Sequence, residues 1–300
     1  MTINNLWKTI LFLVFLNAFG FLHVSAQKGV PNPSKTNQAV LFTRVLERRL
    51  AELDWTMEKF CPQNNIFTRR ILSEYGAAFV GMGKLARSCY LKDENTVLQT
   101  QNQFGFSART VGGVKIELQA AAMEALLKAA AEAKKQGLSI TPKGGASAAR
   151  RSFETTVSFW ESRVEPGLNH WVEEKKLTLK QANKIRALPT FEQVVAILEL
   201  EERKIYFSTY FDKSILQSVA APGASQHNLM LALDVVQFTD PKVRRILAKH
   251  GWFQTVASDK PHFTYLGVGE DKLPALGLYS VTIEGQIFWI PRMQENLKIQ

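Results

Sequence analysis

The sequence predicts an α+β fold, in which helices flank a small antiparallel sheet and a helical N-terminal extension precedes it. Apolar residues recur at helical spacing in several segments, and short strand-like runs gather in the last third of the chain. The helices and strands do not alternate regularly, which argues against a doubly wound parallel sheet. Of the 300 residues, 46% are hydrophobic, which is enough for a substantial core.

The first residues have the pattern of a secretory signal. Lys8 precedes an almost wholly apolar run over residues 10–24, and Val24-Ser25-Ala26 matches a small-residue cleavage site. The run is short for a membrane-spanning helix, although an uncleaved anchor is the alternative. We therefore expect a signal peptide over residues 1–26 and an exported protein, periplasmic or extracellular.

The formal net charge is +10, which bears on the kinds of molecule that the protein could bind. A basic exported protein suits an anionic cell-wall or membrane surface, although the charge equally suits solubility alone. Nucleic acid is not expected as a partner, because the basic residues are scattered and the N-terminus predicts export. The sequence leaves the oligomeric state open.

Cys61 and Cys89 are the only cysteines, and both follow the predicted cleavage site. In an oxidising compartment they are a candidate disulfide, which would hold two helices together as a hairpin. The alternative is two free thiols.

Residues 27–113 are predicted to form a linker and the helical extension. Residues 27–37 have a loose linker composition, and helical patterns cover about residues 38–59 and 66–85. Residues 90–113 are polar and contain glycine, so they indicate a connection or irregular strands.

Residues 114–300 are predicted to form the main domain, which opens with helices. An Ala-, Leu- and Glu-rich helix covers residues 116–135 and ends at Gly137, and residues 138–141 follow as a short strand. The apolar stripe of the next helix consists of Phe153, Val157 and Trp160.

Capping patterns mark three further helix starts. Thr178 and Thr190 each precede a glutamine by three residues, which is the arrangement of a capping box. Asp240 and Pro241 supply an N-cap and a first-turn proline for another helix, which ends at Gly251.

Three segments after the helices have strand character. Residues 229–236 are apolar enough for a buried strand, and residues 263–266 form a second strand-like run. Residues 278–290 are predicted to form a hairpin that turns at Glu284 and Gly285.

Two histidines and an aspartate lie at the two buried strands: His227 before the first, Asp234 within it and His262 at the start of the second. Residues seven apart in one strand point to opposite faces, so His227 must lie on a loop, or the strand must contain a bulge, for His227 and Asp234 to meet. Two imidazoles and one carboxylate are the usual protein ligands of a catalytic zinc, with the fourth position left to water. The alternative is a polar loop histidine and a buried, hydrogen-bonded aspartate.

A family resemblance rests on residues 220–227, Ala-Ala-Pro-Gly-Ala-Ser-Gln-His, followed by residues 232–235, Ala-Leu-Asp-Val. These segments resemble the zinc D-alanyl-D-alanine carboxypeptidase and peptidoglycan endopeptidase family, the VanY-like metallopeptidases. That family has the pattern Pro-Gly-x-Ser-x-His-x-x-Gly-x-Ala-x-Asp and then Glu-x-x-His near its end. Residues 247–253 and 118–140 also resemble family segments, so the likeness covers about residues 115–267.

The resemblance implies that His227, Asp234 and His262 bind zinc, with three departures from the family pattern. Met230 stands where the family has glycine, so the backbone there must accept a side chain. Pro261 replaces a common tryptophan. Asp259 stands where the family has its catalytic glutamate, which makes Asp259 the expected general base although its side chain is one methylene shorter.

The family also has a substrate-binding arginine after its first strand. Here that stretch contains Lys143, Arg150 and Arg151, and the register between them is ambiguous. Arginine suits the role because its planar fork grips a carboxylate at two points. The alternative for each residue is a solvated surface charge. Ser225 is expected to form a turn or to support a ligand by a hydrogen bond rather than to act as a nucleophile.

The resemblance thus implies an exported zinc metallopeptidase that hydrolyses peptide bonds in peptidoglycan stem peptides, as a carboxypeptidase or an endopeptidase. Met230 and Asp259 motivate an alternative, a non-catalytic cell-wall-binding or interaction protein on the same scaffold. A third possibility is a zinc peptidase with another substrate, for which the helical extension sets the specificity.

Overall fold

The computed structural model describes residues 40–294, so the predicted signal peptide and the linker over residues 27–37 lie outside the described residues. The α+β class is confirmed. The α-helices of the described part are α1 (Phe42–Ala51), α2 (Met57–Phe60), α3 (Ile66–Tyr75), α4 (Glu94–Phe104), α5 (Ala120–Lys135), α6 (Phe153–Glu173), α7 (Leu179–Arg186), α8 (Thr190–Glu202) and α9 (Pro241–Lys249). The short 3-10 helices are η1 (Gly76–Val80), η2 (Gly145–Ala148), η3 (Ile215–Gln217) and η4 (Glu270–Leu276).

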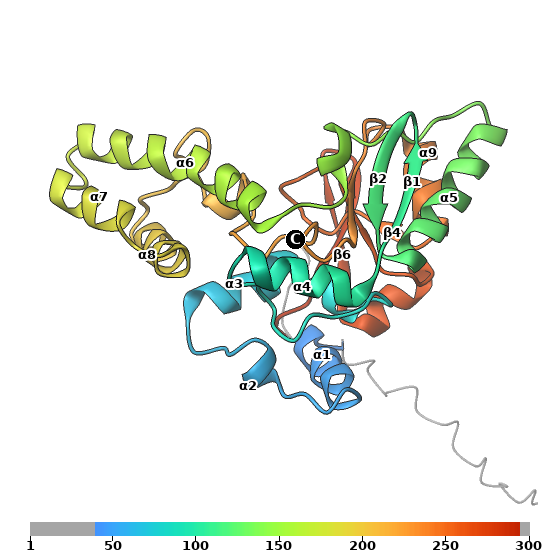
Figure 1. Ribbon diagram of the computed structural model, residues 1–300, viewed down its shortest axis with the longest axis horizontal. Helices are drawn as coiled ribbons and strands as arrows, with labels where there is room; N and C mark the ends of the chain where they lie inside the picture. Colours follow the sequence, from blue (N-terminus) through green and yellow to red (C-terminus); the bar gives the residue numbers. More distant parts are fainter. Residues whose placement is uncertain (1–39, 295–300) are drawn as a thin grey trace, which may run out of the picture. The chain divides into compact units, whose positions relative to one another are not determined.

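The strands of the described residues form small antiparallel sheets, three in number (Figure 1). The strands are β1 (Ser107–Val111), β2 (Val114–Leu118), β3 (Ala232–Asp234), β4 (Trp252–Phe253), β5 (His262–Tyr265), β6 (Leu278–Ile283) and β7 (Gln286–Pro291). The central sheet has the order β3-β5-β4, and Asp234 lies opposite His262 in its register. The other two sheets are the β1–β2 and β6–β7 hairpins.

The C-terminal hairpin follows the prediction. It turns at Glu284 and Gly285, whose φ values are 48° and 74°. The strand predicted over residues 138–141 does not form. Only Pro142 makes a bridge, to Val235, because the backbone N–H of Thr141 donates instead to the side chain of Gln237.

The two helices predicted for the extension are shorter than the sequence pattern suggests. The first divides into α1 and α2, and Asp54 between them has a φ of 57°, which a right-handed helix cannot contain. The second, α3, ends before Gly76, where a Cβ atom would lie 2.8 Å from the ring of Phe42. The 3-10 helix η1 follows directly, so the chain continues from Gly76 in a tighter helical turn.

Residues 90–113, predicted as a connection or irregular strands, instead contain helix α4 and strand β1. The side chain of Asp93 caps α4 by accepting the N–H of Thr96 at 2.7 Å. The helix predicted from Ile116 begins at Ala120, because Ile116 and Leu118 lie in β2 and are buried there.

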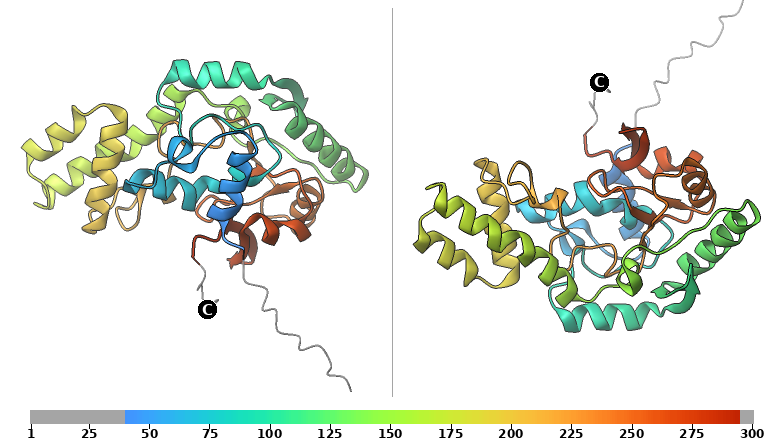
Figure 2. Two further views of the ribbon diagram at one scale, coloured as in Figure 1. Left: turned by 90° about the horizontal axis from the view of Figure 1, so that it is seen from below. Right: turned by 90° about the horizontal axis from the view of Figure 1, so that it is seen from above.

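Helices α6, α7 and α8 form a helical arm (residues 153–202) that extends away from the sheets (Figures 1 and 2). Thr178 and Gln181 make the predicted capping box at the start of α7. The capping box predicted at Thr190 is absent, because Thr190 is itself the first residue of α8 and Pro189 precedes it. Asp240 caps α9 as predicted, by accepting the N–H of Lys242 at 2.7 Å.

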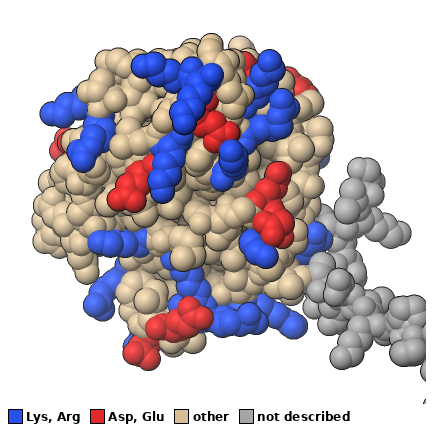
Figure 3. Space-filling model, turned by 90° about the vertical axis from the view of Figure 1, so that its right-hand side faces the viewer, with Lys and Arg blue, Asp and Glu red and all other residues tan. Residues whose placement is uncertain are grey.

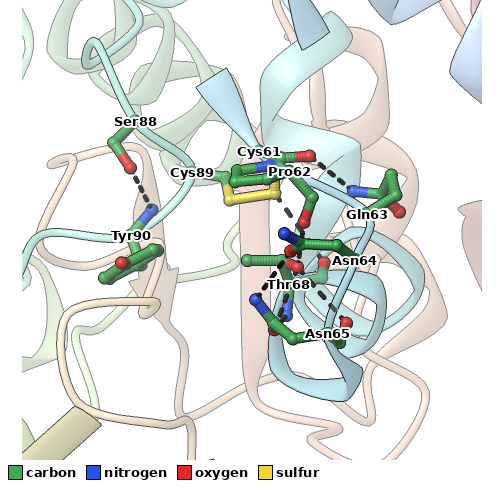
Figure 4. Close-up of a disulfide and its surroundings, with 9 residues drawn as sticks. All are labelled: Cys61, Pro62, Gln63, Asn64, Asn65, Thr68, Ser88, Cys89 and Tyr90. Carbon is green, nitrogen blue, oxygen red and sulfur yellow. Dashed lines mark hydrogen bonds between the residues drawn. A yellow bond between two sulfur atoms is a disulfide. The ribbon is translucent and has the colours of Figure 1, made fainter. Parts of the chain in front are cut away.

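Cys61 and Cys89 form a disulfide (Figure 4). Cys61 follows α2 directly, and Cys89 lies in the irregular segment between η1 and α4, so the bond ties a helix end to a loop rather than closing a helical hairpin. The N–H of Cys89 also donates to the carbonyl of Phe60 at 2.9 Å.

Buried residues of the extension and of the main domain belong to one hydrophobic core, and residues 40–294 lie in one compact unit. Phe42 illustrates this, because it is fully buried and its N–H donates to the carbonyl of Arg292 at 3.0 Å. Within residues 40–294 no helix combines the length and the apolar character needed to cross a bilayer. Lys and Arg side chains are spread over the face in Figure 3, with Asp and Glu among them.

Candidate metal centre

Three predicted ligands converge in the structure. His227 Nε2 lies 3.2 Å from His262 Nδ1, and each of these nitrogens lies 3.4 Å from Asp234 Oδ1. Asp234 is the last residue of β3 and His262 is the first residue of β5, so the strand pairing sets their separation. His227 lies in the turn before β3, as the seven-residue spacing requires.

The outer nitrogens of both imidazoles are held by groups that only accept hydrogen bonds. His227 Nδ1 donates to the carbonyl of Ala149 at 2.8 Å, and His262 Nε2 donates to Gln226 Oε1 at 2.8 Å. Gln226 Nε2 donates to the carbonyl of Tyr75 at 2.8 Å, which fixes the amide so that its oxygen faces His262. Each ring therefore carries its proton on the outside and turns a lone pair toward the other two ligands.

A short chain of hydroxyl groups supports Gln226. The hydroxyl of Thr264 also donates to Gln226 Oε1, and the hydroxyls of Thr264 and Thr255 lie 2.6 Å apart. All three side chains are buried. This network keeps the acceptor in place beneath His262.

Asp234 Oδ1 is buried and has no hydrogen-bond partner within the described part of the chain. The other oxygen, Oδ2, accepts a hydrogen bond from Arg151 Nη2 at 2.5 Å. Lone pairs of the two imidazole nitrogens and of Asp234 Oδ1 thus face one buried point, and none of the three groups donates a hydrogen bond there. Leaving a buried acceptor unpaired destabilises the folded state. A cation removes that cost, and two nitrogens with one carboxylate oxygen suit zinc.

The pKa shifts favour the forms that bind a metal. Burial lowers the pKa of His227 to about 4, which keeps its imidazole neutral. The guanidinium of Arg151 donates to Asp234 Oδ2 and so favours the ionised form of this carboxylate. A neutral imidazole and an ionised carboxylate are the states that ligate zinc.

The turn that presents His227 depends on two unusual backbone positions. Gly223 has a φ of 74°, and a Cβ atom there would overlap the carbonyl oxygen of Leu91. Met230 has a φ of 56°, which is uncommon for a residue with a side chain. Its side chain is fully buried, and that burial offsets the backbone cost.

A cavity of about 310 Å³ opens beside His227 and His262. Its wall includes His227, His262, Asp259, Arg151 and Arg163. The predicted general base, Asp259, therefore shares a cavity with two of the predicted zinc ligands.

Asp259 is an exposed residue, although its carboxyl lies in the wall of the cavity. Desolvation of the carboxyl by the surrounding protein raises the pKa of Asp259, and the nearby Asp234 adds to this while His262 opposes it. Its backbone carbonyl accepts the N–H of His262 at 3.1 Å, so the base and the ligand are tied through the main chain.

Ser225 also lines the cavity. Its hydroxyl accepts the N–H of His227 at 3.3 Å, which helps to form the turn.

The structure separates the three basic candidates for substrate binding. Arg150 donates to Glu117 and to Gln101, each at 2.7 Å, and does not line this cavity. Lys143 is exposed, with its ammonium 5.3 Å from the ring centre of Phe238. Arg151 lines the cavity but is paired with Asp234, a contact that the sequence did not predict.

Two residues at the site, Gln226 and Arg163, were not predicted from the sequence. Gln226 adjoins His227, but nothing in the chain indicates that its amide would meet His262, 36 residues later. Arg163 lies on α6 and faces the cavity, held by a hydrogen bond of 2.8 Å from its Nε to Ser218 Oγ. No motif marks this arginine, because the helical arm brings it to the site from outside the recognisable segments.

No family model matches the chain, and no curated protein matches it. Two solved structures are similar to it. One is a mutant of the vancomycin-resistance D,D-pentapeptidase VanY from a VanB-type resistance cassette, in complex with Zn(II), with 17% identity, a TM-score of 0.31 and coverage of 56% of this chain and 82% of that one. The other is VanYB in complex with D-alanine-D-alanine, with 17% identity, a TM-score of 0.33 and coverage of 59% and 87%. At this identity and these TM-scores, the chemistry of the site has to be argued from its own residues.

Proposed function

We propose that this protein is an exported zinc metallopeptidase that hydrolyses peptide bonds in the stem peptides of peptidoglycan. The observation that carries the proposal is the convergence of lone pairs from His227, Asp234 and His262 on one buried point. The resemblance of residues 220–235 to the D-alanyl-D-alanine peptidase pattern supports the substrate class.

Asp259 would handle the protons of the reaction. A zinc ion in the site would supply a Lewis acid that polarises the scissile carbonyl and lowers the pKa of water to roughly 7. The carboxylate of Asp259 would accept the proton of the attacking water and return it to the leaving amine. Its raised pKa brings this carboxyl closer to the working pH, where a base transfers protons most effectively.

Arg163 favours a carboxypeptidase over an endopeptidase. Its guanidinium lines the cavity, and it pairs with no carboxylate of residues 40–294. An arginine held in place without an acidic partner suits the terminal carboxylate of a peptide. An endopeptidase would have no need of such a group at this position.

Export is supported by two independent features. The N-terminal residues have the pattern of a cleavable signal, and the Cys61–Cys89 disulfide suits an oxidising compartment. Fractionation of producing cells, followed by N-terminal sequencing of the mature chain, tests this part of the proposal.

Metal content and hydrolysis together test the function. We expect about one zinc per mature chain (residues 27–300) by elemental analysis, and release of D-alanine from a diacetylated L-Lys-D-Ala-D-Ala tripeptide. His227→Ala should abolish both, whereas His170→Ala, which alters a histidine stacked on Phe211 in another region, should change neither. A wild-type protein without zinc, or undiminished zinc in His227→Ala, would overturn the assignment.

The alternative is a non-catalytic wall-binding protein, and the carboxylate of Asp259 motivates it. Aspartate is one methylene shorter than the glutamate of the resembled family, so the base could fall short of the attacking water. Under this alternative the protein would bind zinc and sediment with purified peptidoglycan, yet release no D-alanine and no cross-linked peptide product.

A further inference from the structure

Arg151 contacts two of the three candidate zinc ligands. Its Nη2 donates to Asp234 Oδ2 at 2.5 Å, and its backbone N–H donates to the carbonyl of His227 at 3.3 Å. The sequence suggested a substrate-binding role for this residue, but its strongest contact is with a ligand residue. Only 17% of its side chain is exposed.

Arg151 is itself held from several sides. Its Nε donates to the carbonyl of Ser147 at 2.8 Å, and its guanidinium lies 5.3 Å from the ring centre of Phe159. Its backbone carbonyl accepts hydrogen bonds from Gln101 Nε2 at 2.9 Å and Asn228 Nδ2 at 3.1 Å. Both the main chain and the side chain of Arg151 are therefore fixed relative to the ligands.

We propose that Arg151 is a positioning residue for the metal ligand Asp234. Its hydrogen bond occupies Oδ2 of Asp234, so that only Oδ1 can bind the ion. This inference rests on the zinc site proposed above. With Oδ2 engaged, Asp234 offers Oδ1 alone, and the protein supplies one oxygen and two nitrogens. Three protein ligands leave the fourth tetrahedral position open, as catalytic zinc sites require.

The charge of Arg151 acts in the same direction. Its guanidinium cancels the charge of Asp234, so a divalent ion in the site keeps a larger net positive charge than beside an unpaired aspartate. Without Arg151, the freed carboxylate could bind the ion through both oxygens and occupy the position that water needs.

Arg150 provides a matched control for Arg151. The two residues are adjacent and carry the same charge, but the side chain of Arg150 donates to Glu117 and Gln101 and to none of the three candidate ligands. A change of charge or of local packing would affect both positions, whereas a change in ligand geometry should follow only from Arg151.

The test uses the full mature protein with Co²⁺ in place of zinc, because the visible absorption of Co²⁺ is stronger in four-coordinate than in five-coordinate sites. We expect the intense four-coordinate spectrum for the wild type, for Arg150→Gln and for Arg151→Lys, which keeps a cationic donor. Arg151→Gln should show weaker bands, with kcat for D-alanine release reduced about ten- to a hundredfold and KM little changed. Circular dichroism establishes that each variant is folded.

The other outcomes separate the possible failures. If Arg151→Gln keeps the wild-type Co²⁺ spectrum while KM rises, Arg151 is a substrate anchor and the positioning role is wrong. Equal spectral changes in Arg150→Gln and Arg151→Gln would also overturn it. If Arg151→Gln does not fold, Arg151→Lys decides: the positioning role is wrong if this variant lacks the four-coordinate Co²⁺ spectrum of the wild type. If the wild type binds neither Co²⁺ nor zinc, the proposed function itself fails.

Discussion

Asp234 and His262 lie opposite each other in the β3–β5 ladder, and this pairing brings Asp234 Oδ1 within 3.4 Å of His262 Nδ1. Residues opposite each other in antiparallel strands project their side chains from the same face, so two candidate ligands are set by backbone hydrogen bonds. The third, His227, comes from the turn before β3 and is fixed by the carbonyl of Ala149. The site is thus built largely by rigid elements.

Asp259 is expected to carry the proton chemistry. Asp259→Asn keeps the size of the side chain but cannot accept a proton, so kcat should fall by about 10²–10⁴ while zinc stays bound. Steady-state hydrolysis and elemental analysis of the same preparation check both parts. Asp271→Asn, at an exposed position paired with Lys272, is the control. Unchanged hydrolysis in Asp259→Asn would eliminate Asp259 as the base.

Lengthening the same side chain tests whether the site is adapted to aspartate. If the cavity has closed around the shorter carboxylate, Asp259→Glu should also be slower, since a displacement of about 1 Å can cost about a hundredfold. Faster hydrolysis by Asp259→Glu would instead indicate that the carboxylate of Asp259 is too short for its position.

Arg163 is expected to bind the terminal carboxylate of the substrate. Arg163→Gln should lower kcat/KM for a peptide with a free C-terminal carboxylate by about ten- to a hundredfold, because a hydrogen-bonded charge is lost. Hydrolysis of the corresponding C-terminal amide should change little. Arg186→Gln removes the same charge from the helical arm at a position paired with Glu165, and should leave both substrates unaffected. An equal loss for the acid and the amide would contradict the assignment.

Glu201 should make stability depend on pH. It is buried, and its carboxylate accepts the hydroxyl of Ser214 and the N–H of Ile215, each at 2.6 Å. Burial raises the pKa of Glu201 above its usual value of 4.5. The folded state therefore binds the proton more tightly than the unfolded state, and this residue's contribution to stability declines as the pH rises from 4.5 through the raised pKa.

Urea denaturation of wild type and Glu201→Gln at a series of pH values measures this effect. The free energy of unfolding of the wild type, relative to the variant, should fall over that interval and level off above it. Glu199→Gln, at an exposed position of the same helix, should follow the wild type. Parallel curves for wild type and Glu201→Gln would show that the carboxyl is not perturbed.

The disulfide should account for a measurable part of the stability. Unfolded but unreduced protein should show no free thiol, and the double substitution Cys61→Ser, Cys89→Ser should lower the free energy of unfolding by about 2–4 kcal/mol, because 28 residues separate the two cysteines. Thiol titration and denaturant unfolding are the measurements. Two reactive thiols before reduction would rule out the bond.

Met230 should tolerate its unusual backbone because of its buried side chain. Met230→Gly would relieve a left-handed conformation that costs about 1–2 kcal/mol, but would remove a buried side chain whose loss typically costs about 2–5 kcal/mol. We therefore expect a net loss of stability in chemical denaturation. A more stable Met230→Gly variant would mean that strain outweighs packing at this turn.

The sequence by itself determined the chemistry-bearing residues and the elements with strong local signals. The three candidate metal ligands follow from the resemblance to the VanY-like pattern. The capping box at Thr178, the N-cap at Asp240 and the C-terminal turn at Glu284 follow from short-range patterns. Hydrogen bonds between residues only a few positions apart determine the caps and the turn, so the local sequence is sufficient to predict them.

Only the tertiary structure decided where α3 ends, that residues 94–104 form a helix next to β1, and which arginine meets Asp234. Gly76, which follows α3, packs against the ring of Phe42, and Arg151 pairs with a carboxylate 83 residues away. Arg150 and Arg151 are alike in sequence terms, yet one pairs with Glu117 and the other with a metal ligand. Long-range packing sets these contacts, and local sequence patterns do not indicate which distant residue each side chain will contact.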